Sequence, residues 1–267
     1  MKNLGSFRTA FLLLSILGLH GLLRADDPKA RALIERMSQA VGGMEKLRAL
    51  RDVEYKYTYR DKKTGKADIS IERYVFDGEL SWARYVAHEY RVFPNKSGTV
   101  IQGYNGKESW VTLDGKLIRD PQAVKMAGFN RKTNFYWFAM MFKLLDPGVT
   151  YKYEGTRNVG GTTYDLVRIG FEAGVGAVQD SYLLYVNRHT HLVDQFLFTV
   201  MDFGIKEPLV MKVTYKEING VKLPVYRTYI ASNWQGQIKG NAWTEEIMED
   251  IKFNNGFDRS LFNKPAS

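Results

Sequence analysis

The most apolar stretch of the chain beyond its first 25 residues is residues 134–146, with the sequence NFYWFAMMFKLLD. A membrane-spanning helix needs about 20 consecutive apolar residues, and Lys143 and Asp146 interrupt this run too early for a span. Pro147 and Gly148 follow, and both residue types end helices. The pattern predicts a short helix that is apolar on nearly all sides, and a soluble protein buries such a helix.

Helical periodicity also marks the region that follows the first 25 residues. Asp27-Pro28 is typical of a helix start, with Asp as the N-cap and Pro at the first helical position. Gly42-Gly43 breaks the pattern, and a second short helix is expected after it. Both helices are amphipathic, so we expect them to lie on a sheet. Their apolar positions are Ala32, Leu33, Met37, Ala40 and Val41 in the first helix and Met44, Leu47 and Leu50 in the second.

From Val53 onward the hydrophobic period changes to two, which indicates strands. Dipeptides such as Asp77-Gly78 and Asn105-Gly106 separate neighbouring strands and favour tight hairpin turns. The expected strands are residues 53–59, 67–76, 79–87, 99–104, 108–113, 149–154, 162–171, 181–187, 193–201, 209–217, 223–232, 236–243 and 245–253.

About thirteen strands are too many for an open flat sheet, because sheets curl or close beyond about ten strands. We therefore predict an α+β, β-dominated fold: a strongly curved antiparallel sheet, or half-closed barrel, wrapped around a few helices. The N-terminal helix pair and residues 134–146 are the segments apolar enough to fill its concave face. Residues 182–186 are apolar at every position, so both faces of the sheet are expected to be covered there.

The beginning of the chain has the pattern of a secretory signal peptide. Lys2 and Arg8 come first, an uncharged run over residues 9–23 follows, and Ala25 precedes an acidic residue. The run is about 15 residues long, which is short for the alternative, a membrane anchor. We expect a signal peptide over residues 1–25, cleaved after Ala25, and a single domain over residues 26–267 because no linker-like or repeated segment divides it.

Composition excludes several kinds of site. The chain contains no cysteine, so disulfides, thiol catalysis, cysteine-ligated metals and a lipoprotein anchor are ruled out. The formal charge is +9, and cleavage removes three basic residues, which leaves +6. This modest excess is compatible with an anionic membrane surface. Basic residues such as Arg60, Lys62, Lys63 and Lys66 lie around one loop, but they lack the context of a nucleic-acid site, and no nucleic-acid partner is expected.

Several segments of the chain carry a family resemblance: residues 40–47, 135–138, 142–148, 161–165, 180–186, 256–258 and 261–262. On these segments the chain resembles the LolA/LolB-like superfamily of outer-membrane lipoprotein carriers, and most closely an uncharacterised periplasmic branch of it. The resemblance implies a half-closed barrel around helices, a periplasmic location and an apolar cavity for acyl chains. It places no individual carrier residue on this sequence.

The candidate site is an apolar cavity lined by the segment 134–146. Methionine suits a variable apolar ligand, and tryptophan and tyrosine combine an apolar body with a polar tip. The expected partner is a hydrophobic ligand such as a lipid or the acyl chains of a lipoprotein, with a membrane surface or a lipoprotein as a further candidate partner. The alternative is that this segment is simply core. The candidate lining residues are Tyr136, Trp137, Phe138, Met140, Met141, Phe142 and Leu145.

Two other classes of function stay open. A hydrolase would use an acidic site, either Glu245 and Glu249 in an acidic run or a buried carboxylate such as Asp165 or Asp180. A structural or interaction module would have the same fold with a filled core. The motifs of serine hydrolases, zinc proteases, phosphate loops and dinucleotide-binding sites are absent from the sequence, so we expect neither a cofactor nor catalysis.

Two local patterns have simple structural explanations. His189 and His191 share one face if they lie in a strand, which invites a metal site, but they are expected to form a surface turn. Glu245 and Glu249 have the same parity as the apolar residues Ile247 and Ile251, which predicts a twisted or bulged strand.

Overall fold

The computed structural model describes residues 27–172, 174–175 and 180–266. The predicted signal peptide and its cleavage site lie outside the described residues. Among the residues that are described, no helix is long and apolar enough to cross a membrane.

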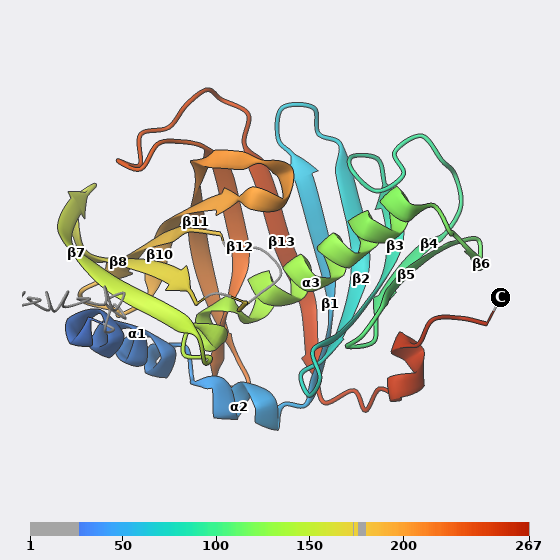
Figure 1. The fold of residues 1–267 in the computed structure, drawn as a ribbon, viewed down its shortest axis with the longest axis horizontal. Helices are drawn as coiled ribbons and strands as arrows, with labels where there is room; N and C mark the ends of the chain where they lie inside the picture. The colour runs from blue at the N-terminus through green and yellow to red at the C-terminus, as the bar shows by residue number, and fades with distance from the viewer. Residues whose placement is uncertain (1–26, 173, 176–179, 267) are drawn as a thin grey trace, which may run out of the picture.

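One open, curved antiparallel sheet of 13 strands forms the body of the molecule (Figure 1). Its order is β6-β5-β4-β3-β2-β1-β13-β12-β11-β10-β9-β8-β7, so two meanders meet where β1 pairs with β13. The predicted fold class is therefore confirmed. The strands are β1 Asp52–Asp61, β2 Ala67–Val75, β3 Leu80–His88, β4 Val100–Tyr104, β5 Ser109–Leu113, β6 Lys116–Leu117, β7 Val149–Val159, β8 Thr162–Phe171, β9 Tyr182–Asn187, β10 Val193–Val200, β11 Ile205–Ile218, β12 Val221–Ala231 and β13 Thr244–Phe253.

The two N-terminal helices are α1 (Pro28–Ala40) and α2 (Met44–Ala49), as predicted. The Asp27 side chain caps α1 by accepting from the backbone N–H of Lys29 and Ala30 at 2.9 and 3.2 Å. It also accepts from the backbone N–H of Tyr153 on the edge strand β7 at 3.1 Å. One residue thus starts the helix and fixes it to the edge of the sheet.

The helix predicted over residues 134–146 is longer than its apolar part. The helix α3 runs from Pro121 to Lys143, over 23 residues. Residues 121–133 form its more polar half, and residues 134–143 form its apolar half. Asp120 caps α3 by accepting from the backbone N–H of Ala123 at 2.8 Å. Asp120-Pro121 has the same Asp-Pro start signal as Asp27-Pro28, so the sequence itself marks the beginning of α3.

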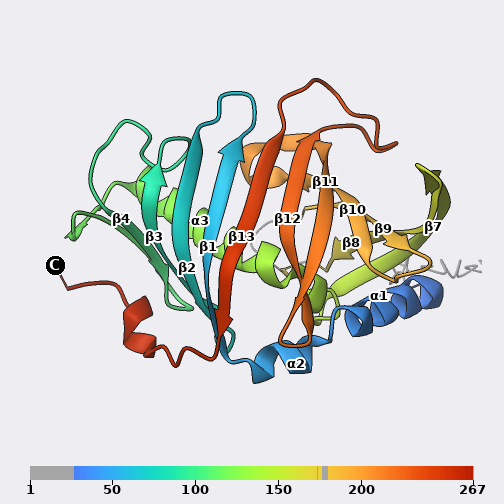
Figure 2. The ribbon, with the colours of Figure 1, turned by 180° about the vertical axis from the view of Figure 1, so that it is seen from behind.

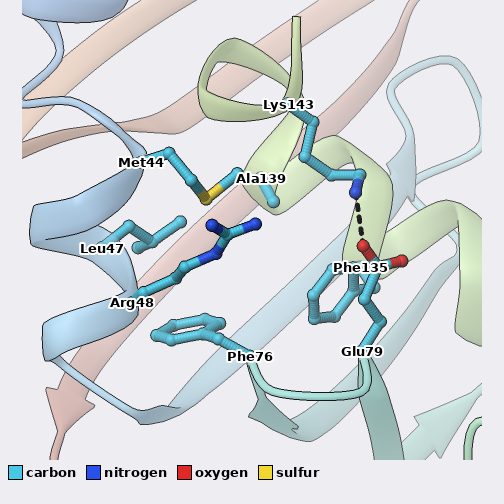
Figure 3. A pocket seen from close by; sticks show the side chains of 8 residues that line it. All are labelled: Met44, Leu47, Arg48, Phe76, Glu79, Phe135, Ala139 and Lys143. Atoms are coloured by element: carbon cyan, nitrogen blue, oxygen red, sulfur yellow. Dashed lines mark hydrogen bonds and ion pairs between the residues drawn. The ribbon is translucent and has the colours of Figure 1, made fainter. Parts of the chain in front are cut away.

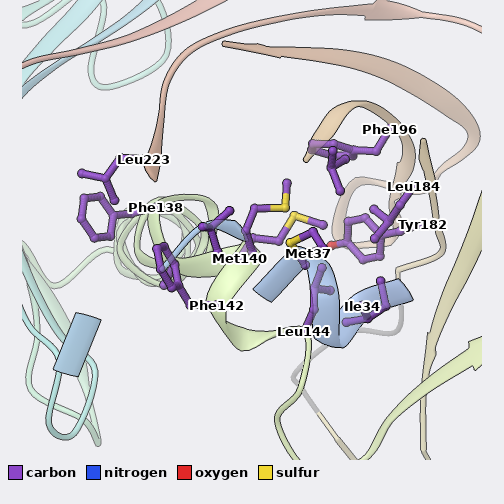
Figure 4. Close-up of a cluster of buried hydrophobic side chains, with 14 of the residues drawn as sticks. Ile34, Met37, Phe138, Met140, Phe142, Leu144, Tyr182, Leu184, Phe196 and Leu223 are labelled. Atoms are coloured by element: carbon purple, nitrogen blue, oxygen red, sulfur yellow. The ribbon is translucent and has the colours of Figure 1, made fainter. Parts of the chain in front are cut away.

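Helix α3 lies diagonally across the concave face of the sheet, and Figure 2 shows it from behind, through the strands. Its apolar half packs into one large core cluster together with α1, α2 and the concave face (Figure 4). The expectation that the helix pair and residues 134–146 fill this face is confirmed. Two short 3₁₀ turns, η1 (Met201–Phe203) and η2 (Arg259–Phe262), complete the helical elements of the described chain.

The strand predicted over residues 236–243 is wrong. The connection between β12 and β13 is a loop that makes a single β-bridge, between Ser232 and Ile238. Gly236 and Gly240 have φ values of +79° and +80°, which do not fit a strand. Trp234 and Trp243 at the two ends of this loop pack against a second apolar cluster on the convex face. The loop therefore explains why β9 is apolar on both faces, as expected.

The predicted irregularity in the acidic strand is confirmed. Between Glu249 and Lys252, β13 has one residue more than the facing stretch of β1, which is a β-bulge. Asp250 within the bulge has a φ of +55°.

Candidate functional site

The structure brings all seven predicted lining residues into the same core cluster. Phe138, Met140, Met141 and Phe142 are buried in it, with exposures of 1 to 3%. Tyr136, Trp137 and Leu145 are partly buried and pack against it. The seven residues therefore lie together in one interior, which their own side chains occupy. Their role as the lining of a ligand cavity stays a prediction.

Successive residues of α3 contact opposite halves of the sheet. The ring of Phe138 stacks on Tyr55 of β1, with centroids 5.5 Å apart, and on Phe76 just after β2, at 6.0 Å. The ring of Trp137 stacks on Phe196 of β10 at 5.7 Å and meets Phe198 edge-on at 5.2 Å. Such aromatic contacts add stability beyond the area they bury. The apolar half of α3 thus bridges the two meanders across the half-barrel.

The polar half of α3 is fixed by a buried ion pair that the sequence analysis missed. Arg131 donates from Nη2 to Oε1 of Glu72 on β2 at 3.1 Å, and from Nη1 to Oε2 at 2.5 Å. Ser70 and Tyr74 also donate to the Glu72 carboxylate, at 2.6 and 2.9 Å. The signal was present, because Ser70, Glu72 and Tyr74 alternate onto the interior face of β2.

A second buried ion pair lies beneath the apolar half. Arg227 of β12 donates from Nε to Oε2 of Glu246 on β13 at 2.7 Å, and both side chains are only 3% exposed. Its Nη1 donates to the backbone carbonyl of Trp137 at 2.8 Å. A buried ion pair of the sheet therefore contacts each half of α3, and both halves also pack against the sheet through apolar side chains.

The acidic run does not form a pair of carboxylates. Glu246 faces the concave side, whereas Glu245 faces the convex side, where it contacts Arg60 at 3.0 Å and accepts from the Tyr226 hydroxyl at 2.7 Å. Burial raises the pKa of Glu245, but the Tyr226 hydroxyl and the nearby cations outweigh it and lower the pKa overall. Glu249 lies four strand residues away, about 13 Å, which exceeds the carboxylate spacing of about 5–9.5 Å in glycosidases.

The other two carboxylates of the hydrolase alternative lie apart from these. Asp165 of β8 accepts from the Tyr153 hydroxyl at 2.9 Å. Asp180 accepts from the backbone N–H of Met201 at 2.8 Å, and burial raises the pKa of its carboxyl group. The four carboxylates are thus dispersed and each is engaged by neighbouring protein groups.

His189 and His191 lie in the turn between β9 and β10, as predicted. The side chain of Asn187 accepts from the backbone N–H of His189 at 2.9 Å, and His191 has a φ of +59°. Within the described ranges, no three His, Asp or Glu side chains gather closely enough to hold a metal ion.

A small hollow brings the apolar core to the surface between α2, α3 and the turn from β2 to β3 (Figure 3). Its volume is about 30 Å³, which holds roughly one water molecule and no acyl chain. Apolar side chains form its inner wall and charged ones its rim. The lining residues are Met44, Leu47, Arg48, Phe76, Glu79, Phe135, Ala139 and Lys143.

A wider groove of about 510 Å³ lies at the other end of α3, between β5, β6 and the start of the helix. It mixes polar and apolar residues and lies outside the large core cluster. Its lining residues are Glu108, Ser109, Trp110, Leu117, Ile118, Arg119, Val124 and Lys264.

No family model matches this chain, and no curated protein resembles it in sequence. Solved structures do resemble it. A LolA superfamily protein from Nitrosomonas europaea has a TM-score of 0.53, with 88% of this chain and 97% of that chain covered. A DUF1329 family protein from Desulfovibrio piger has a TM-score of 0.51, with 88% and 96% covered. A putative outer membrane lipoprotein-sorting protein domain from Vibrio parahaemolyticus has a TM-score of 0.50, with 88% and 96% covered.

All three are 11% identical to this chain, so the likeness is one of fold. The class of protein is a curved antiparallel half-barrel wrapped around a helix. This particular half-barrel has the LolA-like fold, which confirms the resemblance seen in the sequence at the level of fold.

Proposed function

We propose that the protein is an exported, periplasmic binding or carrier protein for a hydrophobic ligand, such as a lipid or the acyl chains of a lipoprotein. The observation that carries the proposal is that the apolar half of α3, packed beside α1 and α2, covers the concave face of an open half-barrel. No strand-to-strand hydrogen bond has to break for this half of α3 to move aside. The signal-peptide pattern at residues 1–25 supports export.

An acyl chain can take the place of the apolar half of α3 against the sheet because both are apolar. Each methylene buried from water contributes about 0.8 kcal/mol, so a long acyl chain replaces the contacts that the apolar half of α3 gives up. Met140 and Met141 lie in this half and adapt readily to changed neighbours. The mechanism is reversible burial, with release when a competing acceptor takes the ligand and the helix returns.

The relatives in fold point in the same direction. One of them is described as a putative outer membrane lipoprotein-sorting protein domain and another as a member of the LolA superfamily. A role in handling lipid-modified proteins or free lipids is the function that this fold and this interior support together.

One observation favours a second candidate, an interaction module with a filled core. The hollow at the edge of the core is only about 30 Å³, and the buried residues of α3 already pack against the sheet. In that case α3 is a permanent part of the core and does not exchange with a ligand.

Tryptophan fluorescence separates these two candidates. The chain has five tryptophans, and Trp137 packs against the concave core, whereas Trp234 and Trp243 pack on the convex cluster. Trp82 and Trp110 belong to a further cluster with Phe262. A fatty acid with bromine atoms along its chain quenches tryptophans that it contacts. We expect quenching in the wild-type protein that is largely lost in Trp137→Phe.

The matched control is Trp234→Phe, which removes a tryptophan from the convex face and should leave the quenched fraction in place. Organic extraction and mass spectrometry of the protein from an exporting host should show bound lipid. Quenching that survives in Trp137→Phe would place the ligand outside the concave face. A clean extract together with no quenching would establish the filled-core module.

A further inference from the structure

We propose that the hollow between α2 and α3 is the head-group site of an amphiphile, and that Arg48 binds an anionic head group there, either a carboxylate or a phosphate. This inference rests on the proposed function and adds the chemical class of the ligand. The apolar chain of this amphiphile enters the core at the hollow, while its charged end stays at the rim.

The inner wall of the hollow leads directly into the core. Phe76 and Phe135 line the hollow, and both belong to the large core cluster (Figure 3). Ala139 lies beside Met44 across the hollow from Phe76 and has the smallest side chain of the lining. A chain that enters beside Ala139 therefore meets aromatic and aliphatic groups at once, which is what an acyl chain leaving water requires.

The rim offers a cation without a partner. Arg48 is exposed on α2, its guanidinium points toward the hollow, and it makes neither a hydrogen bond nor an ion pair with any residue that the structure describes. Guanidinium groups bind carboxylates and phosphates through two parallel hydrogen bonds. Lys46 and Arg51 lie on the same stretch of chain and, with Arg48, outnumber its one acidic residue, Glu45, so this surface favours anions.

The opposite side of the rim shows how an oxyanion sits at this hollow. Lys143 donates to the carboxylate of Glu79 and to Oδ2 of Asp146, the latter at 2.6 Å. Burial alone would lower the pKa of Lys143, but these two contacts outweigh it and raise the pKa, so the ammonium stays charged. The Glu79 side chain is 50% exposed and is therefore the carboxylate that an incoming head group can replace.

Head-group selectivity follows from these contacts. An anionic amphiphile accepts hydrogen bonds from the Arg48 guanidinium and competes with Glu79 for the Lys143 ammonium. A neutral amphiphile with the same chain forms neither charged contact. A hydrogen bond between charged groups contributes enough to favour the anion by about tenfold or more. Because Arg48 is exposed, the preference should shrink as salt screens the charges.

The test compares palmitate, palmityl phosphate and palmityl alcohol as competitors of an environment-sensitive acyl probe. We expect both anions to bind about tenfold more tightly than the alcohol at low salt. Arg48→Gln should remove this preference and leave the affinity for the alcohol unchanged. Glu79→Gln should tighten both anions because it removes their competitor. The two anions differ in charge and geometry, so their ratio tells a carboxylate site from a phosphate site.

Lys46→Gln is the matched control, because it removes the same charge from the same short helix at a residue outside the lining. It should leave all three affinities unchanged. Equal losses in Arg48→Gln and Lys46→Gln, or an alcohol that binds as tightly as the acid, would overturn the head-group site and leave the carrier function intact. If the acyl probe itself fails to bind the protein, the carrier function is contradicted as well.

Discussion

Arg131 of α3 and Glu72 of β2 form a two-pronged ion pair in which neither side chain is exposed. They lie 59 residues apart in sequence, and the pair gives the polar half of α3 one position on the sheet. Two oxygens of one carboxylate meet two nitrogens of one guanidinium, an arrangement that adds geometric specificity to the attraction. Ser70, Tyr74 and Asn134 also donate to the carboxylate.

Breaking this pair from one side should be costly. Arg131→Met leaves the Glu72 carboxylate buried without its cation, and removing one partner of a buried pair costs about 3–5 kcal/mol. Glu72→Gln combined with Arg131→Met should cost less than the sum of the single changes, because no charge is then left alone. Urea unfolding of the four proteins gives the coupling free energy directly.

The exposed pair of Lys56 and Glu249 is the control for this cycle, with side chains 39% and 50% exposed. Lys56→Met should cost between about 0 and 1 kcal/mol. If Arg131→Met costs no more than Lys56→Met, the buried pair is not what holds the polar half of α3.

A second prediction concerns the close approach of two strands. Gly103 of β4 lies directly opposite Trp110 of β5, and a Cβ atom added at Gly103 would lie 2.3 Å from the indole ring. The indole is fixed, because its Nε1 donates to the carbonyl of Phe262 at 2.9 Å. Gly103→Ala should therefore destabilise the protein by about 1–3 kcal/mol, as overpacking does. The midpoint of urea unfolding measures this loss.

Removing the ring should relieve the clash. In the Trp110→Leu background, Gly103→Ala should cost clearly less than it does alone. The same cost in both backgrounds would mean that backbone flexibility of Gly103, and not the indole, is responsible.

Much of this fold follows from local patterns in the sequence. Period-two alternation located the strands, and Asp27-Pro28 located the start of α1, because both signals depend on neighbouring residues. Asp120-Pro121 carries the same start signal, but the helix predicted from the continuous apolar run begins only at residue 134. The first half of α3 packs Ala123, Val124 and Ala127 against a separate small apolar cluster. Its polar face turns out to contact a polar patch of the sheet through Arg131.

The candidate site was only partly predictable. The apolar residues of α3 could be found because they are contiguous, and they do lie together in the core. The hollow could not be found, because Arg48, Glu79 and Lys143 come from three elements far apart in the sequence. Residues 236–243 have the pattern of a strand that ends at Trp243, whereas they lie in a loop whose two tryptophans, Trp234 and Trp243, pack on the convex face.

A third prediction concerns alkaline pH. Burial raises the pKa of Tyr55, Tyr57, Tyr74 and Tyr182 well above the ordinary value of 10.0. In the unfolded chain these hydroxyls ionise near pH 10, while the folded protein keeps them protonated, so the unfolded state binds fewer protons. Stability is therefore fully present below about pH 10 and falls above it, by about 1.4 kcal/mol per pH unit for each such tyrosine.

Urea unfolding between about pH 8 and pH 11 measures this slope, and tyrosinate absorbance tells whether ionisation accompanies unfolding. Tyr57→Phe should make the slope shallower by one proton. Tyrosinate that forms in full near pH 10 while the protein is still folded would contradict the burial of these hydroxyls.

The last prediction tests which half of α3 moves when a ligand binds. An ideal Cβ atom at Gly128 lies 3.4 Å from the Cβ atom of Ser109 on β5, close to the spacing of about 3.5–4.5 Å in disulfides. Since the chain has no cysteine, Ser109→Cys with Gly128→Cys can form a single bridge. It should stabilise the protein by about 3 kcal/mol, because it closes a loop of about 20 residues in the unfolded chain.

This bridge locks the polar half of α3 and leaves the apolar half free. If the apolar half alone moves aside, the oxidised variant should bind a brominated fatty acid and show quenching of Trp137 as the wild type does. The reduced variant and Gly128→Cys alone serve as controls for the substitutions themselves. Binding that disappears on oxidation and returns on reduction would show that the whole helix leaves the sheet, and with it the contact between Arg131 and Glu72. Stability measurements on the same samples would separate that outcome from a distorted fold, because a strained bridge lowers the unfolding midpoint.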